Sequence, residues 1–222
     1  MCKKGKIMIH EKDAESLRII EGCPSYSQAH QDLFVRAMLD FKTGGSYVEI
    51  GASEPKQSNN TFILERDFKW SGISFEINPL LVEAFRAVRL NPCLATDATT
   101  FDYLNYFTEN NFPKQIDYLS LDIDPAEITY QALKRIPLSD YRFSVITYEH
   151  DRYSSGADCM KKSRDYLEGF GYVRVVSNVL CCGRDFEDWY VDPSAVDAKV
   201  YGQYISEGIE CADIFKNKGN LK

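Results

Sequence analysis

Short apolar stretches alternate with helix-like segments along most of the chain, and this alternation restricts the fold more than any other feature. The strand-like stretches are residues 46–51, 72–77, 92–98, 116–124, 142–150, 171–180 and 187–191. Strands that alternate with helices of about 10–15 residues form βαβ units and a mainly parallel sheet. We therefore predict an α/β fold with a mainly parallel seven-stranded sheet and helices on both faces. The last two strands follow the final helix and can form an antiparallel pair at one edge.

Polar residues mark the expected helix starts. The expected caps are Ser27, Ser58, Asn78, Thr100 and Asp124. Asn78 precedes a proline, which suits the first helical position, and Asp124 with Glu127 forms a capping box. A tail from residue 194 has a helical pattern. We predict an N-terminal extension over residues 1–26 and a single domain over residues 27–222.

The bulk composition excludes several classes of protein. The chain has 222 residues, a net charge of −7 and no basic run, which argues against a nucleic acid as the main partner. It contains no 18-residue apolar run and no signal-peptide pattern, so we expect no membrane span and a cytoplasmic location. The seven cysteines contain no CxxC pair and are expected to be reduced thiols. The oligomeric state stays open.

Acidic residues end five consecutive predicted strands. They are Glu49, Glu76, Asp97, Asp122, Asp124, Glu149 and Asp151. In open α/β sheets, ligands bind beyond the carboxyl ends of the strands. A phosphate site would need glycines, amides and cations there, so this edge suits a ligand with hydroxyls, an amine or a positive charge, or a metal ion.

Glu76 narrows the choice of ligand. An acid at the end of the second strand, about 25 residues after Gly51, suits the two hydroxyls of a ribose. The pyrophosphate fingerprint GxGxxG is absent, which argues against a dinucleotide. A nucleoside with a cationic group fits better, and S-adenosylmethionine is such a ligand.

Four segments carry a family resemblance: SQAHQD (27–32), GGSYVEIGASEPKQSNNTFILER (44–66), WSGISFEINP (70–79) and IDYLSLDIDPAE (116–127). Together they resemble the FkbM-type S-adenosylmethionine-dependent methyltransferases, as a divergent subgroup. The likeness covers residues 27–151 and implies a Rossmann-like class I methyltransferase fold. The chain departs from the family pattern at Pro55 and at Asp124-Pro125.

The resemblance implies roles for particular residues. The cofactor-binding residues would be Glu49, Gly51, Ala52, Ser58, Asn59, Glu76, Ile77, Asp97, Ala98 and Asp122. Glu49 and Gly51 would line the methionine end of the cofactor, Glu76 would bind the ribose, and Asp97 and Ala98 would lie beside the adenine. Asp122 would face the amino group or the substrate, and Ser58 and Asn59 would order the loop.

The chemistry of methyl transfer suggests catalytic candidates. An alcohol is a poor nucleophile, so its methylation needs a base or a metal ion. His150, between Glu149 and Asp151, is the expected base, with Asp122 and Asp124 as further catalytic candidates. Asp122, Asp124 and His150 are alternatively ligands of Mg²⁺. His150 could also be a strand-end histidine that only makes hydrogen bonds.

The sequence therefore predicts a methyltransferase that acts on a hydroxyl of a small molecule or glycan, such as a sugar or small natural product. A metal-dependent version of the reaction is the second possibility. Pro55 and Pro125 motivate a different alternative, a catalytically inactive methyltransferase fold that serves as a binding module. Trp189 is either a sugar platform or a core residue.

Overall fold

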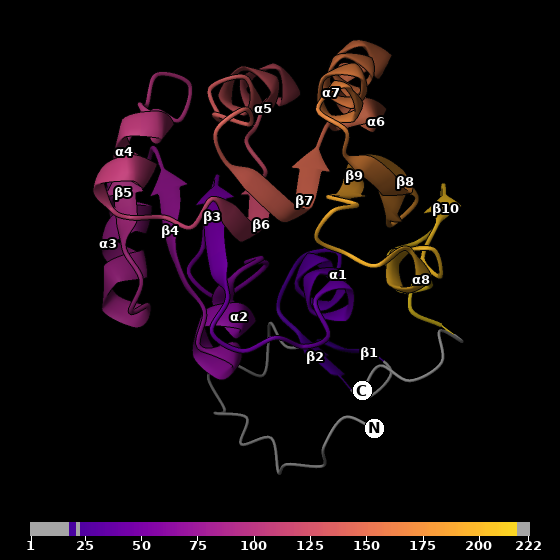
Figure 1. Ribbon diagram of the computed structural model, residues 1–222, viewed down its shortest axis with the longest axis horizontal. Helices are drawn as coiled ribbons and strands as arrows, with labels where there is room; N and C mark the ends of the chain where they lie inside the picture. Colours follow the sequence, from indigo (N-terminus) through magenta and orange to yellow (C-terminus); the bar gives the residue numbers. More distant parts are fainter. Residues whose placement is uncertain (1–17, 21–22, 217–222) are drawn as a thin grey trace.

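An eight-stranded sheet runs through the centre of the computed structural model, which describes residues 18–20 and 23–216 (Figure 1). Its strands are β3 (Ser46–Ile50), β4 (Ser71–Glu76), β5 (Cys93–Ala95), β6 (Gln115–Leu121), β7 (Arg142–Glu149), β8 (Val173–Cys181), β9 (Arg184–Val191) and β10 (Ser206–Glu207). Their order across the sheet is β10-β8-β9-β7-β6-β3-β4-β5. A separate hairpin pairs β1 (Arg18–Ile20) with β2 (Cys23–Ser25).

The strand directions confirm the predicted mainly parallel sheet. β3 pairs in parallel with β4 and β6, and β5 and β7 extend the sheet in parallel on either side. β9 lies between β7 and β8 and is antiparallel to both, which gives the expected antiparallel pair. The sheet gains one strand over the prediction, because β10 pairs in parallel with β8.

Eight helices connect the strands of the described chain. They are α1 (Gln31–Met38), α2 (Phe62–Phe68), α3 (Pro79–Val88), α4 (Tyr103–Glu109), α5 (Ala126–Leu133), α6 (Arg152–Ser155), α7 (Ala157–Gly169) and α8 (Ala198–Tyr201). The tail predicted as helical contains only the four-residue α8 before β10.

Side-chain hydrogen bonds at the starts of α3 and α4 test two of the predicted caps. The Asn78 side chain accepts a hydrogen bond from the Leu80 amide at 3.0 Å, which confirms that cap. The cap predicted at Thr100 is wrong, because Asp102 accepts from the Asn105 amide at 3.1 Å and caps α4.

The predicted caps at Ser27, Ser58 and Asp124 do not lie directly at the starts of their helices. The Ser27 hydroxyl accepts from the Asp32 amide at 3.0 Å, although α1 begins only at Gln31. Ser58 lies in the left-handed region at φ 51° and precedes α2 by several residues, so it does not cap that helix. The capping box at Asp124 is not formed either, since α5 begins after Pro125 without a side-chain cap. Asp124 is instead exposed, beside the cavity described below.

Two hydrophobic cores lie on opposite faces of the sheet (Figure 1). The first contains α1, α2 and the C-terminal segment, and it includes Leu33, Phe62 and Trp189. The second contains α4, α5 and α7, and it includes Phe107 and Leu133. Because helices cover both faces, the central strands are apolar almost throughout.

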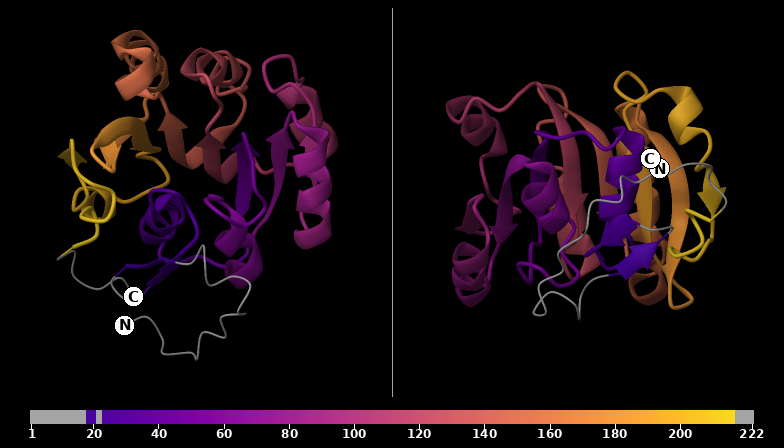
Figure 2. Two further views of the ribbon diagram at one scale, coloured as in Figure 1. Left: turned by 180° about the vertical axis from the view of Figure 1, so that it is seen from behind. Right: turned by 90° about the horizontal axis from the view of Figure 1, so that it is seen from below.

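The N-terminal and C-terminal parts of the domain lie side by side (Figure 2). Phe34 of α1 packs against Tyr204, with ring centroids 6.3 Å apart, and Phe215 joins the same core. Cys23 and Tyr26 are also buried in it. The rest of the predicted extension, apart from β1, lies outside the described residues, so the boundary at residue 26 stays a prediction.

No helix among residues 18–20 and 23–216 has the length and apolarity needed to cross a membrane.

Candidate active site

The carboxyl ends of β3, β4, β6 and β7 surround a cavity of about 730 Å³, called here the main cavity. Many residues expected at a ligand site line it. Those residues are Glu49, Gly51, Ala52, Ser58, Asn59, Glu76, Ile77, Asp122 and Asp124. The topology explains this grouping, since parallel strands bring their carboxyl ends to one edge of the sheet.

A second, more apolar space of about 290 Å³ adjoins the main cavity, and we call it the apolar slot. The two spaces share Gly51, Glu76, Ile77, Ile123 and Asp124. The apolar slot adds the predicted residues Asp97 and Ala98, together with Ile128. Ile77 is 71% exposed beside it, so an aliphatic side chain is available to pack on a flat ligand.

Gly51 makes the close approach between the carboxyl ends of β3 and β6 possible. Its φ is +85°, and a Cβ atom there would lie 1.7 Å from the Asp122 carbonyl oxygen. No other residue fits this position. The Asp122 amide also donates to the Ile50 carbonyl at 3.0 Å, so Asp122 is fixed directly beside the turn.

The Glu76 carboxylate is held by two backbone amides. Its Oε2 accepts from the Ser53 amide at 3.0 Å and its Oε1 accepts from the Asn78 amide at 2.8 Å. Each carboxylate oxygen has a further lone pair, and Glu76 lines both spaces. The side chain can therefore accept two hydrogen bonds from a ligand that spans the main cavity and the apolar slot.

Asp97 and Ala98 lie at the far side of the apolar slot. The Asp97 carboxylate accepts from the Thr99 hydroxyl at 2.7 Å and from the Thr99 amide at 2.8 Å, and these bonds lower the pKa of Asp97. The Ala98 carbonyl accepts from the buried Tyr103 hydroxyl.

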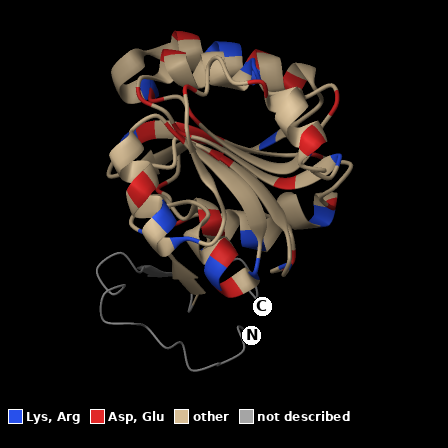
Figure 3. Cartoon of the chain, turned by 90° about the vertical axis from the view of Figure 1, so that its left-hand side faces the viewer, with Lys and Arg blue, Asp and Glu red and all other residues tan. Residues whose placement is uncertain are grey.

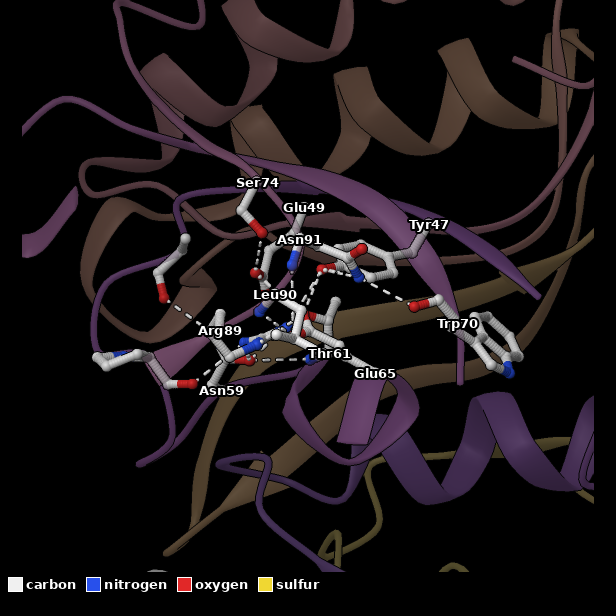
Figure 4. A network of polar contacts seen from close by, with 12 residues as sticks. Tyr47, Glu49, Asn59, Thr61, Glu65, Trp70, Ser74, Arg89, Leu90 and Asn91 are labelled. Atoms are coloured by element: carbon white, nitrogen blue, oxygen red, sulfur yellow. Dashed lines mark hydrogen bonds and ion pairs between the residues drawn. The ribbon is translucent and has the colours of Figure 1, made fainter. Parts of the chain in front are cut away.

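Below the loop of residues 52–59 lies a buried network centred on Arg89 (Figure 4). The guanidinium pairs with Glu65 at 2.8 Å and donates to the Asn59 side chain at 2.9 Å and to the Thr61 hydroxyl at 2.9 Å. It also donates to the Pro55 carbonyl at 3.1 Å. Pro55 is therefore tied to the protein beneath the loop and is not one of the residues that line the main cavity.

Asn59 and Glu49 extend this network to the cavity. The Asn59 side chain donates to the Ala52 carbonyl at 3.1 Å and so closes the loop onto its own start. Glu49 accepts from Thr61 at 3.0 Å and from Ser74 at 2.7 Å. Burial raises the pKa of Glu49, and nearby Arg89 partly opposes this rise. Sequence reasoning missed Arg89, because it ends a helix far from any motif.

Four carboxyl groups form an acidic cluster on one wall of the main cavity: Asp122, Asp124, Glu149 and Asp151. Hydrogen bonds link Asp122 to Glu149, Glu149 to Asp151, and Asp151 to Asp124. Figure 3 shows acidic segments gathered near one end of the central strands.

Burial and the neighbouring charges raise the pKa values of three carboxyls in this cluster, namely Asp122, Glu149 and Asp151. Burial is the main cause at Asp122 and Glu149, and the neighbouring Asp122 carboxyl raises the pKa of Glu149 further. Burial and then Asp124 raise the pKa of Asp151 to about 6. No ion pair found among the described residues joins a cation to any of the four carboxyls.

His150 lies behind the cavity wall. Its side chain is fully buried, Nδ1 accepts from the Arg152 amide at 3.2 Å, and Nε2 faces Asp188 at 3.5 Å. Both ring nitrogens therefore face groups behind the cavity wall rather than the cavity. The structure does not bring His150 together with Asp122 and Asp124 at the main cavity, so the geometry does not favour the predicted base.

The metal alternative also lacks support from the geometry. Within residues 23–216, no group of three or more His, Cys, Asp or Glu side chains is arranged to hold a metal ion. Asp122 and Asp124 lie at the main cavity, while His150 lies behind its wall.

The aromatic residues near the site divide into two groups. Trp189 is fully buried and stacks near Phe34, with ring centroids 4.7 Å apart, so it is a core residue. Tyr148 is also fully buried, whereas Tyr153 is 49% exposed and lines the main cavity. Gln28 and Asn60 line it as well. The quoted motif segments contain both residues, but only the fold brings them to the cavity.

Comparisons with known proteins agree with this architecture. No protein-family model matches the sequence, and no curated protein matches it. Among solved structures, a protein provisionally described as an rRNA methylase from Clostridium thermocellum has a TM-score of 0.50 at 12% identity, over 74% of this chain and 94% of that chain.

Two further structures are similar at slightly lower scores. A human methyltransferase 10 domain-containing protein has a TM-score of 0.49 at 11% identity, over 73% of this chain and 80% of that chain. A TehB-like methyltransferase from Corynebacterium glutamicum has a TM-score of 0.46 at 12% identity, over 76% of this chain and 89% of that chain. The sheet order and the similarity to the first of these structures show a Rossmann-like α/β fold.

Proposed function

We propose that the protein is an S-adenosylmethionine-dependent methyltransferase that methylates a hydroxyl group on a sugar or small natural product. The observation that carries the proposal is the position of Glu76. Its carboxylate is held by two backbone amides between the main cavity and the apolar slot. This is the arrangement that a ribose with two adjacent hydroxyls requires.

The apolar slot suits the adenine end of the cofactor, and the main cavity suits its methionine end. The apolar slot offers Ile77, Ala98 and Ile128 to a flat adenine ring. On the other side of Glu76, Glu49 and Asp122 line the main cavity and can attract the ammonium and sulfonium groups. Gly51 allows the backbone to approach this end closely.

The bound cofactor would supply an electrophilic methyl group on a positively charged sulfur. The protein must then align the acceptor oxygen and remove its proton. Asp122 and Asp124 remain the proposed catalytic side chains from the sequence, and both line the main cavity. Transfer of that methyl group to the acceptor oxygen would break its bond to sulfur and leave the cofactor as a neutral thioether, while the hydroxyl proton would pass to a carboxylate of this wall.

The motif segments support a place in the FkbM-type subgroup. Asn59, in the segment that resembles the family, ties the loop to Ala52, and Ala52 and Ser58 line the main cavity beside it. Pro55, where the family has a glycine, has its carbonyl bound by Arg89 below the loop. The departure from the family pattern is therefore compatible with an open cofactor site.

A catalytically inactive binding module is the second candidate, and the buried position of His150 favours it. This candidate predicts cofactor binding without methyl transfer to any hydroxyl acceptor. A metal-dependent reaction predicts that EDTA abolishes transfer and that Mg²⁺ restores it.

Thermal unfolding with and without S-adenosylhomocysteine tests the cofactor site. At a ligand concentration 100-fold above Kd, binding adds about 2.7 kcal/mol to stability. For a domain of this length, this corresponds to a rise in Tm of about 5–11 °C. Glu76→Ala should lose most of that rise. Glu83→Ala, which removes an exposed carboxylate from α3, should keep it. The proposal fails if wild type shows no rise at millimolar ligand.

A further inference from the structure

A third cavity of about 260 Å³ opens from the main cavity toward the β8–β9 hairpin. We call it the side cavity. The two cavities share Gln28, Glu149, Asp151 and Tyr153. The volume of the side cavity is below the range of about 300–1,000 Å³ that is typical of sites for drug-sized ligands. It therefore suits a small molecule, which would reach the main cavity at the acidic cluster.

The side cavity has an acidic floor. Glu149, Asp151 and Phe186 are its deeply buried members, with 9%, 6% and 3% of their surface exposed. Cys182 and Arg184 are exposed and form the rim. The Arg184 guanidinium lies 5.4 Å from the centre of the Tyr153 ring, so this cation lies over an aromatic ring at the rim.

The backbone fixes Asp151 in place. Its φ is 45°, its amide donates to the Phe186 carbonyl at 2.9 Å, and its own carbonyl accepts from the Ser154 and Ser155 amides at 2.9 Å. His150, buried directly before it, accepts from the Arg152 amide. These bonds hold the Asp151 backbone in the cavity wall without any ligand.

The carboxyls that line the joined cavities have no ion-pair partner within the described protein. No cation there forms an ion pair with Asp122, Asp124, Glu149 or Asp151, and the two that the cavities share, Glu149 and Asp151, are both buried. Buried charges without partners are costly. A cofactor with one net positive charge would balance only part of this cluster.

A separate observation, outside the cluster, concerns the main cavity that the side cavity joins. Asn60 is 5% exposed and lines the main cavity. Its Nδ2 donates to the Ser120 hydroxyl at 3.0 Å, but its Oδ1 has no hydrogen-bond partner among the described residues. Buried carbonyl oxygens of this kind normally have a donor.

From these observations we infer that the side cavity binds the methyl acceptor, and that the acceptor is a small hydroxylated amine whose ammonium group is held by Asp151 and Glu149. The assignment as acceptor site rests on the proposed function, whereas the preference for an amine rests on the cavity alone. An amino sugar has the required chemistry: hydroxyls to accept the methyl group and an ammonium to balance the carboxylates. Phe186 gives the ring one apolar surface to pack on.

Two matched pairs of probes test the inference: glucosamine against glucose, and ethanolamine against ethylene glycol. Binding is measured at pH 7.5 by protein-observed NMR, with and without saturating S-adenosylhomocysteine. We expect the amine of at least one pair to bind at least tenfold more tightly than its neutral partner. Asp151→Asn should reduce this preference to less than threefold, whereas Asp165→Asn, on the exposed side of α7, should keep it.

Cys182 reports on the same cavity without any cofactor. A neutral thiol reagent labels this exposed cysteine, and mass spectrometry of the labelled peptides gives its rate. An amine that occupies the side cavity should slow the labelling of Cys182 at least threefold, while the neutral partner should not. Equal affinities within both pairs, or equal labelling rates, would overturn the inference.

The two proposals fail in different ways. If S-adenosylhomocysteine does not bind but the amines protect Cys182, the cofactor proposal is wrong and the amine site remains. If S-adenosylhomocysteine binds and neither pair shows a preference for the amine, the cofactor site remains and the amine inference is wrong.

Discussion

Replacing Asp151 with asparagine should stabilise the ligand-free protein at neutral pH. Burial and neighbouring carboxyls raise the pKa of Asp151 from 3.8 to about 6. A raised carboxyl pKa favours folding below the unfolded pKa, and this contribution is lost as pH rises through the folded pKa. The full shift of about 2 units corresponds to about 3 kcal/mol, of which about 2.4 kcal/mol falls between pH 4 and pH 8, because the unfolded carboxyl is already partly ionised at pH 4. Asparagine does not titrate and tolerates the left-handed backbone at this position.

The assay is urea unfolding of wild type, Asp151→Asn and the exposed control Asp165→Asn at several pH values from 4 to 8. The quantity of interest is the change in ΔΔG between pH 4 and pH 8, because any pH-independent cost of the substitution cancels. Because the protonation of Asp151 also depends on the neighbouring carboxyls, we expect about 1–2 kcal/mol in favour of Asp151→Asn at pH 8. A ΔΔG that stays constant with pH would refute the claim that burial and the neighbouring carboxyls raise the pKa of Asp151.

Three further substitutions test other parts of the structure. Gly51→Ala should cost at least about 3 kcal/mol in urea unfolding, because its Cβ overlaps the Asp122 carbonyl and its φ is unfavourable; Gly183→Ala, with the same sign of φ and open space, should cost only about 1–2 kcal/mol. Arg89→Met should cost about 3–5 kcal/mol, because it leaves buried partners unpaired; a loss below 1 kcal/mol would contradict the network. His150→Gln should cost about 1–3 kcal/mol and leave the calorimetric Kd for S-adenosylhomocysteine within threefold of wild type; a tenfold weaker Kd would place His150 at the cofactor.

The sheet was predictable because its signal is local. The central strands β6 and β7 are buried on both faces, so they appear in the sequence as continuous apolar runs. Short apolar runs of this kind predicted the seven strands from β3 to β9. The cap at Asn78 was predicted separately, from the proline that follows it. The two-residue β10 was missed, because so short a strand has no periodicity and depends on pairing with β8.

The site was predictable only where a residue ends a strand. Glu76 and Gly51 follow strands directly, so the topology places them at the cavity edge. Arg89 and Asn60 reach the site through the packing of distant segments, which no spacing in the sequence reveals. His150 follows a strand too, but it comes directly after Glu149, which lines the cavity. Successive strand side chains point to opposite sides, so the His150 side chain points behind the wall toward Asp188.

Isothermal titration calorimetry with S-adenosylhomocysteine tests the central claim most directly. We predict one binding site in wild type, an affinity at least tenfold weaker in Glu76→Ala, an unchanged affinity in Glu83→Ala, and no binding of NAD under the same conditions. No heat of binding at millimolar S-adenosylhomocysteine, or an equal Kd in wild type and Glu76→Ala, would contradict the assignment of the main cavity and apolar slot as a methyl-donor site.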